Sequence, residues 1–379
     1  MIYLEDYKSG HYEKGLSYRY FVPCKINDEW TWTTPEISSL LEKAAIRLGE
    51  LNSFARLVPN VGLFIQLHVT KEAVESSRIE GTQTNMDEAI LPQEEIDPER
   101  RLDWKEVHNY IVALNEAVKD LENLPLSSRV LRKTHAKLLQ GVRGEHKLPG
   151  EYRRSQNWIG GISLSDAAFI PPHDKYVDEL MGDLENFLHN DQVSVPSLIR
   201  AAIAHYQFET IHPFLDGNGR IGRLLITLYL VSKGILEKPL LYLSAYFEQN
   251  KNLYYDNLTR VRTHSDLRQW IKYFLVGIEQ TSAEAVEKLR RMLDLKSQIE
   301  AELNSELGRR TSTSLLLLHH LFKNPSITVE KAMEACNISY KSANQLIEVF
   351  EQRGYLKEIT GKSRNRMFVF HEYVKLFNH

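Results

Sequence analysis

This chain of 379 residues has few cysteines, no long apolar run and no overall basic charge. The two cysteines, Cys24 and Cys336, lie far apart and form no Cys-x-x-Cys pair, which excludes a disulfide framework and a cysteine-based zinc site. The longest mainly apolar run, 224–231, is less than half of the roughly 20 residues needed to span a bilayer. A net charge of −3 gives no basic field over the whole chain, so any nucleic-acid surface would have to be local.

The N-terminus also lacks a basic segment followed by an apolar one. We therefore expect no signal peptide, no membrane attachment and a cytoplasmic location. Hydrophobic residues make up 42% and charged residues 26% of the chain, which is typical of a globular protein. The length is sufficient for two or three domains, and the sequence leaves the oligomeric state open, with a homodimer among the options.

What the chain does contain is helical periodicity, which predicts a mostly α-helical fold. Helices are expected at 35–57, 61–80, 103–122, 126–140, 174–189 and 195–210. Another helix is expected from the end of segment 212–223 to about residue 233, and two or three more across 241–298. Gly81 stands where a left-handed helix cap is wanted. The acidic stretch 84–100 has two prolines and is predicted as a loop, whereas 148–172 contains two short extended runs that predict a β-hairpin.

The most informative segment is 212–223, with the sequence HPFLDGNGRIGR. His212 is a side chain that accepts a proton near neutral pH, and Asp216 is a hard oxygen ligand suited to Mg²⁺. Gly217 and Gly219 allow a ligand to approach the backbone closely, and Asn218 supplies an amide. The segment opens a helix, whose free N–H groups and dipole favour a bound anion.

Two arginines complete this inventory. Arg220 and Arg223 are three residues apart, so they share a helix face, and two guanidinium groups suit a di- or triphosphate. Three other interpretations compete. The residues Gly217 to Gly222 match the dinucleotide pattern GxGxxG, but a helix precedes them and no βαβ unit surrounds them. His205 and His212 could form a metal pair, although no third ligand is evident. The segment could also be a structural helix cap.

The whole segment resembles the signature loop of Fic-domain proteins, His-x-Phe-x-Asp/Glu-Gly-Asn-Gly-Arg-x-x-Arg, and matches it at every specified position. The resemblance covers about residues 100–290. It implies a mostly helical fold with a β-hairpin flap, and transfer of AMP from Mg·ATP to a protein hydroxyl. By resemblance, His212 is the general base and Asp216 holds Mg²⁺. The expected ATP-binding residues in the loop are Gly217, Asn218, Gly219, Arg220, Gly222 and Arg223, with Asn218 and the 217–220 backbone at the α-phosphate and the arginines at the β- and γ-phosphates.

Two further features refine the resemblance. The kinase-like Doc branch of the family carries lysine at the position of Gly219, so this chain is similar to the adenylyl transferases. Upstream, Ser76, Glu80 and Gly81 resemble the inhibitory motif Ser/Thr-x-x-x-Glu-Gly/Asn, in a helix at about 63–81. That motif implies that the Glu80 carboxylate pairs with Arg223 and takes the place of the γ-phosphate of ATP. An ordinary surface helix that ends in Glu-Gly is the alternative.

The resemblance also indicates which residues contact the adenine of ATP and which contact the target protein. A tyrosine of the 251–259 helix is expected against the adenine; Tyr254 and Tyr255 are the candidates, and Tyr255 is the better match. The flap is expected to dock the target protein, with Trp158 and Ile159 pairing with an extended target segment by strand addition. The expected docking residues are Trp158, Ile159, Phe169 and Ile170. Simple core packing is the alternative for Tyr254 and for Trp158.

Four regions are expected: an N-terminal region 1–99 with the inhibitory helix, a Fic domain 100–290, a linker helix 291–310, and a winged helix-turn-helix 311–379. The last region has nine lysines and arginines against six glutamates, an excess of three positive charges near the proposed wing. It would contact DNA through Tyr340, Lys341 and Asn344, or alternatively dock a protein.

Two functions are therefore weighed. The first is a self-inhibited protein adenylyltransferase that uses ATP and Mg²⁺ and modifies an unknown target protein or itself. Glu80 would in addition position a water for the removal of AMP if the enzyme works in that direction, and another pyrophosphate-containing donor could replace ATP. The second function is a DNA-binding regulator whose Fic domain senses nucleotide. The first has the stronger sequence support, because the loop pattern is complete.

Overall fold

The computed structural model describes residues 1–15, 17–58, 61–306 and 311–378. The expectation of a mostly helical fold is confirmed. Before the signature loop the elements are β1 (Ile2–Tyr3), β2 (Gly10–Lys14), β3 (Arg19–Pro23), β4 (Trp30–Thr31), α1 (Pro35–Leu57), α2 (Gly62–Ile79), α3 (Met86–Ala89), η1 (Gln93–Glu95), η2 (Pro98–Arg100), α4 (Arg101–Asp120), α5 (Ser128–Leu138), η3 (Asp174–Tyr176), α6 (Val177–His189) and α7 (Ser197–Ile211).

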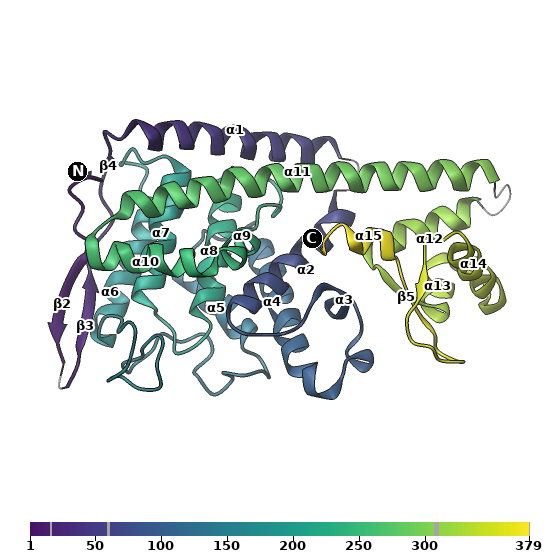
Figure 1. The fold of residues 1–379 in the computed structure, drawn as a ribbon, viewed down its shortest axis with the longest axis horizontal. Helices are drawn as coiled ribbons and strands as arrows, with labels where there is room; N and C mark the ends of the chain where they lie inside the picture. The colour runs from purple at the N-terminus through teal and green to yellow at the C-terminus, as the bar shows by residue number, and fades with distance from the viewer. Residues whose placement is uncertain (16, 59–60, 307–310, 379) are drawn as a thin grey trace.

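Four more helices and a C-terminal segment follow. They are α8 (Asn218–Ser232), α9 (Ser244–Gln249), α10 (Lys251–His264), α11 (Leu267–Glu306), α12 (Thr311–Lys323), β5 (Ser326–Thr328), α13 (Val329–Cys336), α14 (Tyr340–Gln352), β6 (Lys357–Glu358), β7 (Met367–Val369) and α15 (His371–Lys375). Figure 1 shows α1 and α11 lying side by side along one edge of the molecule. The boundary expected at residue 290 falls inside the continuous helix α11, and 307–310 of the expected linker lie outside the described residues.

The helical core places the signature loop between two buried helices. Almost every residue of α7 is buried, as are most residues of α8, so both helices lie inside the bundle and their connection is held from all sides. Trp270 of α11 is fully buried and donates its indole N–H to the carbonyl of Ala202 in α7, 2.8 Å away. The site is therefore built on rigid core elements, which suits a constellation that must hold its geometry.

The stretch 84–100 is one place where the expectation of a loop is wrong in part, because it contains the short helix α3. Its cause is a capping box. The side chain of Asn85 accepts a hydrogen bond from the backbone of Glu88 at 2.9 Å, and the Glu88 carboxylate accepts one from the backbone of Asn85 at 3.2 Å. These two bonds satisfy N–H groups that a helix start leaves free, which stabilises even a single turn.

The segment 148–172 is less regular than a hairpin. Ile159 and Phe169 form one isolated antiparallel bridge, with backbone N–O distances of 2.8 and 3.1 Å. The carbonyl of Ile170 also accepts a hydrogen bond from the backbone of Phe21 in β3, at 3.0 Å. The expected flap is thus a looped segment pinned at one bridge and docked against the β2–β3 hairpin.

The C-terminal segment consists of the helices α12, α13 and α14, the strands β6 and β7, and the short elements β5 and α15. The strands form an antiparallel sheet of order β5-β7-β6. This segment packs on the helix that carries Glu80: the rings of Phe64 in α2 and Phe322 in α12 are 5.6 Å apart. Its assignment as a winged helix-turn-helix stays a prediction.

Candidate active site

The signature loop begins with a reversal of the backbone at His212. This residue ends α7 in the left-handed conformation with φ of +50°, a conformation that costs a non-glycine residue about 1–2 kcal/mol. The His212 carbonyl accepts hydrogen bonds from Arg153 Nε at 2.9 Å and from Asn157 Nδ2 at 3.3 Å. Arg153 is 2% exposed and also binds the carbonyls of Pro172 and Ile211. The stem of the flap therefore fixes the turn that presents the His212 side chain.

A second set of bonds closes the loop on itself. The Asn218 amide donates to the Phe214 carbonyl at 2.8 Å, and its oxygen accepts from the Phe214 N–H at 2.8 Å. His135 accepts from the backbone of Gly150 through Nδ1, so its Nε2 is protonated and donates to the Asp216 carbonyl at 2.9 Å. The oxygen and one N–H of the Asn218 amide are therefore used inside the loop, and the backbone N–H groups that follow are further donors for an anion.

Those backbone donors belong to the first turn of α8. Gly217, with φ of +73°, precedes the helix. The first bond into the helix runs from the N–H of Ile221 to the Gly217 carbonyl at 3.1 Å. The N–H groups of 218–220 come before that bond and have no partner within the helix. They point out of the helix N-terminus, where the dipole favours negative charge.

The imidazole of His212 is electrically neutral at physiological pH. Burial lowers its pKa to about 4, and the charge of Arg153 lowers it further. Its Nδ1 is buried. A neutral imidazole carries a lone pair that can accept a proton, which is the property a general base needs.

His205 does not form a metal pair with His212. Its Nδ1 lies 2.8 Å from the Gly222 carbonyl and its Nε2 lies 2.9 Å from the Tyr254 hydroxyl, so both ring nitrogens are used in the core. Within the described ranges no group of three or more His, Cys, Asp or Glu side chains is arranged to hold a metal. The dinucleotide interpretation fails as well, because helix α7 and not a strand leads into the loop.

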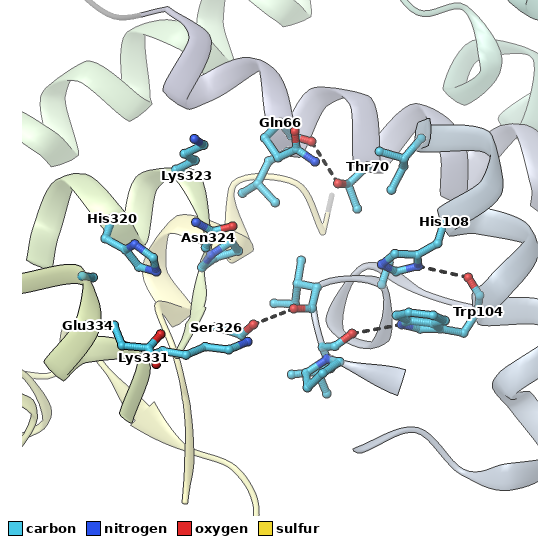
Figure 2. Close-up of a pocket in the computed structure, with 18 residues that line it drawn as sticks. Gln66, Thr70, Trp104, His108, His320, Lys323, Asn324, Ser326, Lys331 and Glu334 are labelled. Atoms are coloured by element: carbon cyan, nitrogen blue, oxygen red, sulfur yellow. Dashed lines mark hydrogen bonds between the residues drawn. The ribbon is translucent and has the colours of Figure 1, made fainter. Parts of the chain in front are cut away.

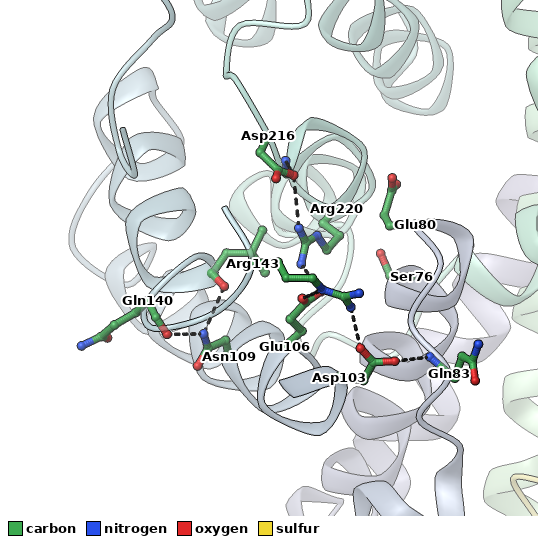
Figure 3. A network of polar contacts seen from close by, with 12 residues as sticks. Ser76, Glu80, Gln83, Asp103, Glu106, Asn109, Gln140, Arg143, Asp216 and Arg220 are labelled. Atoms are coloured by element: carbon green, nitrogen blue, oxygen red, sulfur yellow. Dashed lines mark hydrogen bonds and ion pairs between the residues drawn. The ribbon is translucent and has the colours of Figure 1, made fainter. Parts of the chain in front are cut away.

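Asp216 and Arg220 stand at one end of a polar network (Figure 3). Arg220 is 4% exposed; it contacts Glu106 at 3.3 Å and Asp216 at 3.6 Å. Glu106 also binds Arg143 Nε at 2.6 Å, and Arg143 Nη2 lies 2.5 Å from Asp103. The Asp216 side chain is 39% exposed, and its Oδ2 has no hydrogen bond in the described structure. An open carboxylate oxygen of this kind fits a magnesium ligand.

Arg223 makes the contact that the inhibitory motif implies. Its Nη2 lies 2.6 Å from Glu80 Oε1 and 2.8 Å from the Ser76 carbonyl, and its Nε lies 2.9 Å from Ser76 Oγ. Burial alone would raise the pKa of Glu80, but the charge and hydrogen bond of Arg223 hold that pKa below its usual value. The carboxylate is therefore ionised. Glu80 caps the C-terminus of α2, and Gly81 follows it with φ of +100°.

Two glycines of the loop make room for carboxylates. A Cβ on Gly219 would run into the Glu80 carboxylate, and one on Gly222 would run into that of Glu209. Sequence reasoning missed Glu209, which lies on α7 three residues before His212. It is 7% exposed, and burial raises its pKa to about 7 against the opposing charge of Arg223. The only local signal for it was a carboxylate on a helix with few charged residues.

The two tyrosine candidates for adenine differ in exposure. Tyr254 is 1% exposed, stacks on Phe247 at 4.5 Å and bonds to His205, so it belongs to the core. Tyr255 is 38% exposed. Its pKa is raised to about 12 by burial and by the charge of Glu80. Of the two, Tyr255 is the one that presents surface beside Glu80.

The flap residues divide in the same way. Trp158 is 40% exposed, whereas Phe169 is 7% exposed and lies under the guanidinium of Arg262 at 4.0 Å. Ile159 and Phe169 pair with each other, and the Ile170 carbonyl is bonded to β3. Of these four residues, Trp158 is therefore the one whose side chain offers an open surface, and the docking role of all four stays a prediction.

The proposed DNA-contacting residues and the basic residues of the proposed wing, which include Lys362 and Arg366, already have partners in part. Lys362 binds Glu95 of the N-terminal region at 2.7 Å, and Arg366 bonds to Asn344 at 3.4 Å. The Asn344 amide also donates to Glu348 at 2.5 Å. Tyr340 remains 54% exposed. Contact with DNA stays a prediction, with fewer free groups than the sequence suggested.

Comparison with known proteins decides the family. Sequence models described as "Fic/DOC family N-terminal" and "Fic/DOC family" match residues 38–119 and 125–230. This chain belongs to the Fic/DOC family. The N-terminal match begins in α1. The similarity to the family therefore begins well before residue 100, the start of the range over which the sequence analysis placed the resemblance.

Relatives support this assignment. The chain is 31% identical over 185 residues to "Protein adenylyltransferase Fic" of Culex quinquefasciatus, covering 46% of this chain and 33% of that protein. It is 27% identical over 217 residues to the protein of the same name from Drosophila yakuba, covering 55% and 41%. The chain thus spans a third to two-fifths of the length of these curated relatives.

Solved structures show the same fold. A Fic family protein from Desulfovibrio desulfuricans G20 superposes with a TM-score of 0.56 at 20% identity, over 91% of this chain and 98% of that chain. A Fic domain containing signaling protein from Bacteroides thetaiotaomicron gives 0.54 at 19%, over 66% and 96%. No helix in the described part of this Fic protein is long and apolar enough to cross a membrane.

Proposed function

We propose that this chain is a self-inhibited protein adenylyltransferase, which moves AMP from ATP to a serine, threonine or tyrosine hydroxyl of a target protein or of itself. The observation that carries the proposal is the ion pair of Glu80 and Arg223 at 2.6 Å, next to a complete signature loop. The names of the relatives and the chemistry of the loop support the transfer of AMP.

The residues divide the reaction as follows. His212 accepts the proton of the attacking hydroxyl, whose oxygen forms a bond to the α-phosphorus while the bond to pyrophosphate breaks. The N–H groups at the start of α8 bind the α-phosphate, where negative charge accumulates. Mg²⁺ bound to Asp216 and to phosphate oxygens would neutralise charge on the leaving pyrophosphate. Arg220 and Arg223 are placed to hold the β- and γ-phosphates.

Inhibition follows from competition for one guanidinium. Arg223 is 3% exposed and already binds Glu80 and two atoms of Ser76. A γ-phosphate can reach Arg223 only if the Glu80 carboxylate leaves, because two anions do not share this buried space. ATP bound beside the ion pair is therefore held without its γ-phosphate in place, and its α-phosphate is poorly aligned for attack.

The test is AMP transfer from ATP labelled on the α-phosphate, in a lysate and with purified protein. The Glu80→Gly variant should label proteins at least about tenfold faster than the wild type, which corresponds to 1.4 kcal/mol. Glu42→Gly on α1, an exposed glutamate with no ion pair to any residue that the structure describes, is the matched control and should label like the wild type. Adding His212→Ala to Glu80→Gly should abolish label. Absence of label in both wild type and Glu80→Gly would contradict the proposal.

A further inference from the structure

A large cavity lies away from the signature loop, between the helix that carries Glu80 and the C-terminal segment (Figure 2). Its volume is about 680 Å³, within the range of about 300–1,000 Å³ that small-molecule sites occupy. No residue of 212–223 lines it. The proposed enzyme activity therefore makes no use of this space.

One wall of the cavity is positively charged. Lys323 at the end of α12 and Lys331 in α13 both line it, and Figure 2 shows Lys331 extending toward Ser326. Neither ammonium group has an ion-pair partner among the described residues. His320 lies with them: burial lowers its pKa, and the charges of both lysines lower it further. Glu334 is the acidic side chain of this lining, so the two lysines leave a positive excess.

The opposite wall is aromatic and fixed. Trp104 and His108 of α4 stack with ring centroids 3.5 Å apart and planes 22° from parallel. The indole N–H of Trp104 donates to the Leu91 carbonyl at 3.0 Å. His108 Nδ1 lies 3.1 Å from the Trp104 carbonyl, so this nitrogen carries the proton and Nε2 carries the lone pair. These bonds hold the rings as a preformed apolar surface.

The remaining wall is formed where the C-terminal segment meets helices α2 and α3. Ser326 of β5 donates its hydroxyl to the Ile90 carbonyl at 2.6 Å, which ties the C-terminal segment to the end of α3. Gln66 and Thr70 of α2 also line the cavity. An occupant would therefore touch three separate segments, as ligands at domain interfaces do.

We propose that this cavity binds a small organic anion, with its phosphate or carboxylate between Lys323 and Lys331 and its flat apolar body against Trp104. Unpaired ammonium groups on one side and a rigid aromatic surface on the other are complementary to that ligand class. The phosphate and the carboxylate share the anionic chemistry that the lysines recognise, and the experiment separates them.

The site also bears on the inhibitory helix, a step that rests on the proposed function. Gln66 and Thr70 stand on α2, the same helix that ends at Glu80. A ligand whose affinity depends on whether α2 is docked or displaced shifts the equilibrium between the state in which Glu80 binds Arg223 and the state in which Arg223 is free. By the same linkage, displacement of α2 changes the affinity for the ligand. Because α2 forms part of the wall, we expect the anion to stabilise the docked helix and to slow AMP transfer.

Calorimetric titration of the full chain with phenyl phosphate tests the site directly, with benzoate as the carboxylate arm and phenol as the uncharged control. At least one anion should bind and phenol should not. Lys323→Gln and Lys331→Gln should each weaken binding by about tenfold, the cost of about 1.4 kcal/mol per lost charge-assisted bond. Lys357→Gln, an exposed lysine of β6, is the matched control and should leave the affinity unchanged.

Several results would overturn the proposal. The first is that neither anion binds. The second is that binding survives in the Lys323→Gln/Lys331→Gln double variant, which would place the anion on the loop arginines instead. A hexaglutamate peptide that binds more tightly than phenyl phosphate would make the cavity a peptide site. Trp104→Phe should weaken phenyl phosphate but not inorganic phosphate, and equal weakening of both would remove the aromatic wall from the account.

The coupling has a separate readout. Phenyl phosphate at saturation should slow AMP labelling by the wild type and have no effect on Glu80→Gly, in which the helix no longer blocks Arg223. Binding in the calorimeter without any change in wild-type labelling would contradict the coupling and leave the site intact. Calorimetry requires no activity, so a failure of the site and a failure of the adenylyltransferase proposal are distinguishable.

Discussion

Arg223 Nη2 lies 2.6 Å from Glu80 Oε1, although 143 residues separate the two in the sequence. Ser76 supplies the other two contacts, so residues at the C-terminal end of α2 engage both Nε and Nη2 of Arg223. The Arg223 side chain is 2% exposed as a result. The same helix is held at its other end by the C-terminal segment through Phe64 and Phe322. Whether Arg223 of the loop is occupied or free therefore depends on the docking of α2.

Ser76→Ala should partly activate AMP transfer. The substitution removes the hydrogen bond from Arg223 Nε to Ser76 Oγ and changes the volume little, in a side chain that is fully buried. A hydrogen bond to a charged group contributes about 1.5–3 kcal/mol, part of which Arg223 regains elsewhere, so we expect labelling to rise about five- to tenfold. Ser53→Ala on α1 is the control. Labelling at or below the wild-type rate would show that Ser76 does not hold the inhibited state.

The pH dependence of transfer should lack the inflection of an ordinary histidine. The pKa of His212 is lowered to about 4, chiefly by burial, so the base stays unprotonated as the pH falls and loses activity only as the pH approaches that value. In the Glu80→Gly variant the nearby carboxylate is gone, which lowers the pKa of His212 further. The rate should therefore be flat from pH 8 to about pH 5.5. Half-maximal activity near pH 6.5 would contradict the environment described for His212.

Thermal stability should fall as the pH rises, through a buried carboxyl of α2. Burial raises the pKa of Glu72 to about 7, against hydrogen bonds from Ser244 at 2.5 Å and Tyr110 at 2.7 Å. A folded-state pKa above the unfolded value gives stability that is complete below about pH 4.5 and is lost as the pH rises through about 7. At 1.36 kcal/mol per pKa unit this amounts to about 3 kcal/mol.

The measurement for Glu72 is the Tm at pH 5 and at pH 8. Glu72→Gln should shrink the difference between the two values, whereas Glu42→Gln on the exposed face of α1 should not. Some slope should remain, because burial also raises the pKa of Glu209 to about 7. An identical pH slope in Glu72→Gln and wild type would mean that Glu72 is already ionised in the folded protein.

The parts of the site whose signal is local can be predicted from the amino-acid sequence. The loop 212–223 is one unbroken pattern, and Glu80 stands in a short motif at the end of a periodic helix, so the residue order alone identifies both. The capping box at Asn85 is also a local signal, because Asn-x-x-Glu is enough to indicate a helix start. The acidic residues and prolines around it favour a loop more strongly, which is why the prediction for that stretch is wrong in part.

The residues that support the loop could not be found in this way. Glu106 meets Arg220 across 114 residues, and Arg153 reaches the His212 carbonyl across 59. Nothing in the sequence near these residues distinguishes them from a surface charge, since only the packed bundle brings them together and buries them. The internal use of the Asn218 amide was hidden for the same reason, because a turn and not a residue type decides it.

The most direct test of the central claim, that Glu80 takes the place of the γ-phosphate on Arg223, is the calorimetric affinity for ATP and for ADP. Both nucleotides are titrated with Mg²⁺ into His212→Ala and into Glu80→Gly/His212→Ala, in which turnover is blocked. The account predicts nearly equal dissociation constants for ATP and ADP while Glu80 is present, and at least about tenfold tighter binding of ATP once it is removed, or 1.4 kcal/mol. An unchanged ratio of the two constants would contradict it.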